Sequence, residues 1–169
     1  AQLTAVTAAM TPVDTGEAGC AEATTVLIKK QPGVQQMARV QTENGYMYYA
    51  YSASMAEKGR NCVYVFEAAS NRQQPLTVIE NVAPAQATLQ GVITHGEHLA
   101  VLARGENCTY LRIYSIAEPT KPVLLSAIEQ SGACVQAGLV GENVYVLSHF
   151  VFDPKAEQSV PALTVNGEI

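Results

Sequence analysis

Short runs of alternating apolar and polar residues cover most of this chain, and turn residues separate the runs. The segment Gly45–Ser52 reads GYMYYAYS, and Cys62–Ala68 reads CVYVFEA. Alternation with a period of two predicts β-strands, because successive side chains of a strand point to opposite faces. The same pattern predicts strands in these further segments: Thr25–Lys29, Leu76–Val82, Ala87–Gly105 (two strands around a His95–Gly96 turn), Cys108–Ile116, Val123–Glu129 and Cys134–Phe150.

The predicted strands recur with a common spacing. The turn glycines Gly45, Gly96 and Gly141 are 51 and 45 residues apart. Cys62 and Cys108, which each open the third strand of a unit, are 46 residues apart. A unit of this length with four short antiparallel strands is the size of a β-propeller blade. We therefore expect an all-β fold of β-propeller-like blades, each a four-stranded antiparallel meander.

This interpretation divides the chain into a linker or lead-in, 1–25, and a partial propeller domain, 26–169. The repeat units are about 36–84, 85–132 and 133–169, which makes two full blades and part of a third. Propellers close with about 4–8 blades, so we expect a fragment of a larger propeller or several chains that close a ring together. The alternatives are a β-sandwich, a flat solenoid, and a repeat spacing that arises by chance, because only two units are complete.

Composition narrows the function classes. The chain has 169 residues, 48% of them hydrophobic, and a net charge of −5. A nucleic-acid groove needs a basic footprint, which this charge balance does not supply, so no nucleic-acid partner is expected. No apolar run reaches the roughly 18 residues of a membrane helix.

Because the chain begins at Ala1 without a signal segment, we expect a removed signal or anchor, or a trimmed chain. The tail Val160–Ile169 suggests that more protein follows.

Four cysteines, Cys20, Cys62, Cys108 and Cys134, stand far apart in the sequence. None forms a C-x-x-C pair or has a histidine at zinc-finger spacing, so no structural zinc site is expected. An even count at wide spacing fits two disulfides outside the cytosol or four buried thiols inside it, and we favour the former. The start of a third strand and the end of a fourth lie on one rim of a meander, which predicts a Cys108–Cys134 disulfide and leaves Cys20–Cys62 as the second pair.

The second unit resembles a known family. His95–Phe150 is similar to a bacterial family of secreted proteins with a C-terminal β-propeller domain of uncharacterised function. Its middle element, Ile113–Pro122, reads IYSIAEPTKP, with Ser115 where the family commonly has Asp. Ala38–Val82 matches more loosely. The resemblance implies an exported, extracellular or cell-surface protein, often tethered to the membrane by an upstream segment. It transfers no catalytic residue.

The cluster His95, Glu97 and His98 is the one candidate for a metal site. Two imidazoles and a carboxylate on a tight turn are suitable ligands for a divalent cation. The plainer interpretation is a polar hairpin tip, because Gly96 stands where a turn needs a positive φ. We expect the hairpin tip and assign no cofactor.

Catalytic residues are sparse. Ser148, His149 and Asp153 contain the residue types of a hydrolytic triad, but no G-x-S-x-G elbow is present. We therefore expect no enzyme activity from this chain. Four tyrosines, at positions 46, 48, 49 and 51, offer a stacking platform for a sugar or peptide, although alternate members of such a strand more often pack in a core.

These observations favour a non-catalytic extracellular interaction module that binds an unknown protein or glycan through its rim loops. A sensor ectodomain of a membrane-anchored regulator is the first alternative, and a fragment of a propeller enzyme is the second. The open flanks of a partial propeller are apolar, so we also expect homo-oligomers through the exposed blade flanks.

Overall fold

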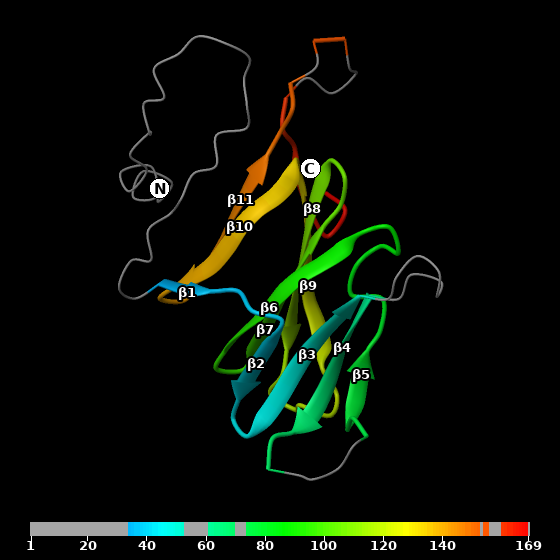
Figure 1. Ribbon diagram of the computed structural model, residues 1–169. Coiled ribbons are helices and arrows are strands. Elements are labelled where there is room, and N and C mark those ends of the chain that lie inside the picture. The colour runs from blue at the N-terminus through cyan, green and yellow to red at the C-terminus, as the bar shows by residue number, and fades with distance from the viewer. Residues whose placement is uncertain (1–33, 53–60, 70–73, 153, 156–159, 169) are drawn as a thin grey trace. The chain divides into compact units, whose positions relative to one another are not determined.

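The computed structural model describes residues 34–52, 61–69, 74–152, 154–155 and 160–168. Every regular element among them is a β-strand, and the strands form three sheets (Figure 1). The prediction of an all-β fold of antiparallel sheets is confirmed. No helix among these residues is long and apolar enough to cross a membrane. The lead-in 1–25 and the predicted strand Thr25–Lys29 lie outside the described residues.

Two of the sheets contain a four-stranded meander. The first sheet has the order β2-β3-β4-β5: β2 (Val40–Glu43), β3 (Tyr46–Ser52), β4 (Asn61–Glu67) and β5 (Thr77–Ile79). The central sheet has the order β12-β9-β8-β7-β6: β6 (Thr88–His95), β7 (His98–Arg104), β8 (Cys108–Ser115), β9 (Val123–Ser131) and β12 (Leu163–Val165). The C-terminal tail therefore adds a fifth strand to the second meander.

The third sheet contains a single hairpin of β10 (Ala133–Val140) and β11 (Asn143–His149), with β1 (Val34–Gln36) on the far side of β10 (Figure 1). The described residues close no ring of sheets, so the propeller itself remains a prediction. All three expected turn glycines do hold positive φ angles, 80° at Gly45, 57° at Gly96 and 59° at Gly141. Glycine adopts this conformation without the steric cost that a side chain would bring.

The central sheet is covered on both faces. Along β7, Leu99, Val101 and Ala103 belong to one apolar cluster, which they share with Tyr48 and Val63 of the first sheet. The residues that alternate with them on β7, Ala100 and Leu102, belong to a second cluster with residues of the β10–β11 hairpin. A strand buried on both faces loses the alternation of apolar and polar residues, which explains the continuous apolar run of β7.

A buried amide joins the first sheet to the chain that enters the central one. The Asn61 side chain is 2% exposed. Its Nδ2 donates to the carbonyl oxygens of Pro84 and Ala87 at 2.7 and 2.8 Å, and its Oδ1 accepts from Ser52 Oγ at 2.6 Å. The Ser52 hydroxyl in turn accepts from the Leu89 N–H at 2.8 Å. Each hydrogen bond of this network gives a buried polar group the partner that it would otherwise lack away from water.

Gly132, between β9 and β10, links the central and third sheets. Its φ is +95°, and a Cβ placed there would lie 2.7 Å from the carbonyl oxygen of His149. We expect Gly132→Ala to lower the free energy of unfolding by about 3 kcal/mol, because both the backbone angle and the overlap with backbone are unfavourable. Gly141→Ala is the control: it also has a positive φ but meets no atom within 4 Å, so we expect a loss of about 1 kcal/mol. Urea denaturation measures both, and equal losses would contradict the packing argument.

Tyr48 gives the fold a sensitivity to alkaline pH. Burial, with smaller contributions from Tyr46 and Glu43, raises the pKa of Tyr48 from 10.0 to about 12. Above pH 10 the unfolded chain releases this proton while the folded chain keeps it, so stability falls as the pH rises towards 12. We expect Tyr48→Phe to reduce this loss while changing stability little at pH 7. Urea denaturation at pH 7 and pH 11 tests it, and an undiminished alkaline loss in the variant would refute the assignment.

Candidate binding surfaces

An apolar groove of about 700 Å³ lies between the central sheet and the β10–β11 hairpin. Its walls include Ile113 of β8, Ile128 of β9 and Val144 of β11. All three side chains are only partly buried, and they pack at the margin of the second apolar cluster. The hairpin therefore covers only part of this face of the central sheet, and the groove is the part left open.

The predicted His95–Glu97–His98 cluster lies at the mouth of this groove. His95 and His98 face each other as the closing pair of the β6–β7 hairpin, and Glu97 stands in the turn between them. Glu142 lines the same mouth from the β10–β11 turn. Among the residues that the structure describes, no three histidine, cysteine, aspartate or glutamate side chains are grouped to hold a metal ion. The cluster thus gives the groove a polar, partly acidic rim.

Ser148, the serine of the hydrolytic triad considered from the sequence, forms hydrogen bonds that connect two strands. Ser148 Oγ donates to the Ser131 carbonyl oxygen at 3.1 Å and accepts from Gln130 Nε2 at 2.7 Å. These contacts tie β11 to the end of β9. His149 is exposed, and Asp153 lies outside the described residues. Among the described residues, the hydroxyl of Ser148 joins two sheets and makes no hydrogen bond to a histidine.

The tyrosines of β3 separate onto two faces of the first sheet. Tyr46 and Tyr48 contact the first apolar cluster, whereas Tyr49 and Tyr51 point away from it. On this second face their rings meet residues of β4. The four rings of Tyr49, Tyr51, Tyr64 and Phe66, which we call the aromatic face, have contacting centroids 5.9 to 6.5 Å apart.

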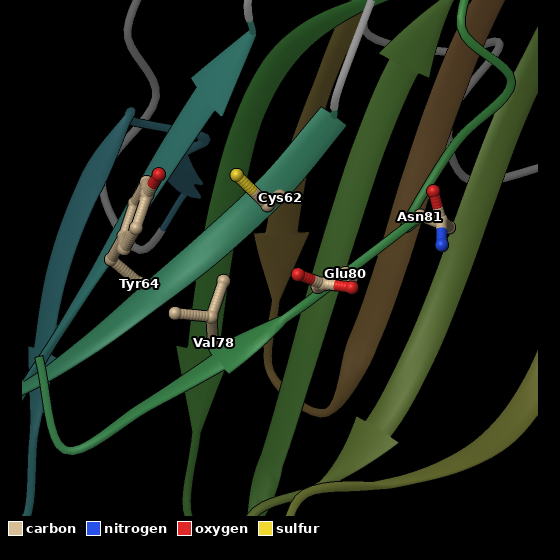
Figure 2. A pocket seen from close by; sticks show the side chains of 5 residues that line it. All are labelled: Cys62, Tyr64, Val78, Glu80 and Asn81. Carbon is tan, nitrogen blue, oxygen red and sulfur yellow. The ribbon is translucent and has the colours of Figure 1, made fainter.

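A small pocket of about 100 Å³ adjoins the aromatic face (Figure 2). Cys62 and Tyr64 of β4 and Val78 of β5 form its apolar part, and Glu80 and Asn81 follow β5 as its polar part. The sequence pattern singles out the tyrosines of β3 and does not single out Tyr64 and Phe66. Alternation within Cys62–Ala68 places these two rings on one face of the strand. Only the register between β3 and β4 shows that Tyr49 and Tyr51 lie on the same face.

The expected Cys108–Cys134 disulfide is wrong. Both residues are free thiols, as is Cys62, while Cys20 lies outside the described residues. Cys134 packs in the cluster that also contains Leu111 of β8. Because strand residues alternate between faces, Cys108, three positions before Leu111, points to the opposite side of the central sheet. The order of strands in the meander predicts that the two cysteines lie at the same end of the sheet. It does not predict the face to which each side chain points.

We expect the thiols of Cys108 and Cys134 to be unpaired and slow to react. Burial raises the pKa of each thiol, which reduces the fraction of reactive thiolate near neutral pH. Alkylation of unreduced protein in denaturant, followed by peptide mapping, should label both residues. Alkylation under native conditions should be much slower at both. A disulfide-linked peptide containing Cys108 would contradict this prediction.

Comparison of the chain with protein-family models, with curated proteins and with solved structures found no match. The family resemblance of the second unit thus stays a prediction.

Proposed function

We propose that this chain is a non-catalytic extracellular interaction module of the β-propeller type. Three observations support the propeller interpretation: two four-stranded meanders follow each other, their facing sides share one apolar cluster, and a third unit starts in the same way. A partial propeller leaves flanks open, and the aromatic face lies on the side of the first sheet that would form such a flank. The extracellular location rests on the family resemblance.

The observation that carries the proposed binding function is the aromatic face. Its four rings are partly exposed, in mutual contact and displayed on the side of the first sheet opposite its core. Aromatic rings have a negative face that attracts the positive C–H groups of a sugar ring. The carboxylate of Glu80 and the amide of Asn81, beside Tyr64, provide acceptors and donors for hydroxyl groups. This combination favours a glycan as the ligand.

Substitution of the aromatic face tests this function. The chain contains no Trp, so its fluorescence comes from its eight tyrosines, three of which belong to the aromatic face. We expect members of an oligosaccharide panel (β-glucans, chitooligosaccharides and mannans) to change this fluorescence saturably. Loss of two stacking rings in Tyr49→Ser with Tyr51→Ser should weaken the binding by roughly tenfold.

Val123→Ser is the matched control, because Val123 is an exposed apolar residue of the central sheet, 58% exposed and away from the aromatic face. It should bind the same oligosaccharides as the unmodified chain. If no saccharide binds, or if the double variant binds as well as the control, the aromatic face is not a glycan site.

A further inference from the structure

The apolar groove lies between the tip of the β10–β11 hairpin and the central sheet. Ile113 of β8 and Ile128 of β9 belong to its floor, and Leu139 and Val144 of the hairpin belong to the opposite wall. Ile113, Ile128 and Val144 are half-buried, whereas Leu139 is only 6% exposed. The groove therefore extends from partly exposed side chains inwards to the buried second apolar cluster.

The apolar lining of the groove is aliphatic. Among the described residues that line it, the apolar side chains are isoleucine, leucine, valine and alanine, with no phenylalanine or tyrosine. The side chains that form hydrogen bonds belong to the two turns and the residues beside them: His95, Glu97, His98, Glu142 and Asn143. An aliphatic wall offers no partner to a hydroxyl or an amide, and such a group costs free energy when it leaves water unpaired. The floor therefore suits a hydrocarbon body.

The backbone beneath this floor is already paired. β8 pairs with β7 on one side and β9 on the other, and Ile128 of β9 pairs with both Leu111 and Val165. An extended peptide on this floor would gain no main-chain hydrogen bonds from β8 or β9, and those bonds supply the affinity when a strand is added to a sheet. The volume of about 700 Å³ lies within the range of about 300–1,000 Å³ that is usual for small-molecule sites. The groove thus suits a small molecule that contacts side chains.

The mouth of the groove carries negative charge. Glu97 stands in the β6–β7 turn and Glu142 in the β10–β11 turn, and both are exposed. Among the described residues, neither glutamate forms an ion pair, and the groove lining contains no lysine or arginine. Two carboxylates without a neutralising cation attract a positively charged group, and an ammonium group can donate hydrogen bonds to their oxygens. The charge of the mouth therefore favours a cationic head group.

We propose that the groove is a binding site for a long-chain aliphatic amine. The hydrocarbon chain lies between Ile113 and Ile128 of the central sheet and Val144 of the hairpin, and the ammonium group lies at the mouth beside Glu97 and Glu142. An apolar cleft with a few polar groups that fix the orientation of the ligand is the usual form of a small-molecule site. The proposal is independent of the aromatic face, which lies on another sheet and has a different chemistry.

Decylamine is the probe, and isothermal titration calorimetry of the full 169-residue chain measures its binding. The titration is made below the critical micelle concentration and at pH 8, above the usual titration range of histidine. We expect saturable binding of one molecule per chain. Decanoate, which has a chain of similar length and an anionic head, should bind at least tenfold more weakly because the mouth repels it. Butylamine should also bind at least tenfold more weakly, because it buries fewer methylene groups.

Removal of the two charges tests the mouth. Glu97→Gln with Glu142→Gln keeps the shape of both side chains, and we expect it to weaken decylamine binding about fivefold. Added salt should weaken binding to the unmodified chain but have little effect on the double variant, because screening acts only on charge. Glu106→Gln is the matched control, since Glu106 is an exposed glutamate of the β7–β8 turn and does not line the groove. It should bind like the unmodified chain.

Substitution of an apolar side chain tests the floor. Ile128→Ser shortens a side chain of the groove and makes it polar, and we expect it to weaken decylamine binding about tenfold. Leu124→Ser is the matched control, because Leu124 lies on the same strand, is 49% exposed and does not line the groove. Urea denaturation confirms that each variant is folded.

Three results would overturn the proposal. The first is no saturable binding of decylamine below its critical micelle concentration. The second is binding of decanoate as tight as that of decylamine, which would remove the cationic head from the ligand class. The third is equal binding of decylamine by the double glutamine variant and Glu106→Gln. Oligosaccharide binding is measured on the same variants, so failure at the groove is distinguished from failure at the aromatic face.

Discussion

Burial of the central sheet on both faces is the constraint on which the rest of this structure depends. The five consecutive buried residues Leu99–Ala103 of β7 contribute alternately to two apolar clusters. A sheet with two apolar faces requires a covering layer on each side, because exposed apolar area is costly in water. The first sheet and the β10–β11 hairpin are these layers. Their arrangement determines where the open surfaces lie.

The unequal size of the two layers produces the groove. Three strands of the first sheet, β3, β4 and β5, supply residues to one cluster, whereas the third sheet brings a hairpin to the other. The same difference leaves the side chains of Ile113 and Ile128 accessible beside the tip of the hairpin. Exposed apolar surface with a polar border is characteristic of interaction sites. In this chain the polar turns at Glu97 and Glu142 border that place.

Strand alternation determines the face on which several candidate side chains lie. The tyrosines of β3 divide between a core and an exposed face, as strand alternation predicts, so only Tyr49 and Tyr51 are available for stacking. Tyr64 and Phe66 of β4 complete the exposed half. Cys108 and Cys134 are separated by the same rule, since Cys108 points to one face of the central sheet and Cys134, on β10, packs against the other face. Ser148 joins β11 to β9 through hydrogen bonds, which is a structural role.

The sequence by itself determined the strands and most of their turns. Period-two alternation located the segments from Gly45 to Phe150, and the positive φ of Gly45, Gly96 and Gly141 follows from local backbone sterics. These features depend on neighbours within a few residues, so a linear pattern records them. The groove, the pairing of β12 with β9 and the facing of each cysteine depend on contacts between residues that are far apart in the sequence. Only the tertiary structure decided them, because many registers and packings satisfy the same alternation.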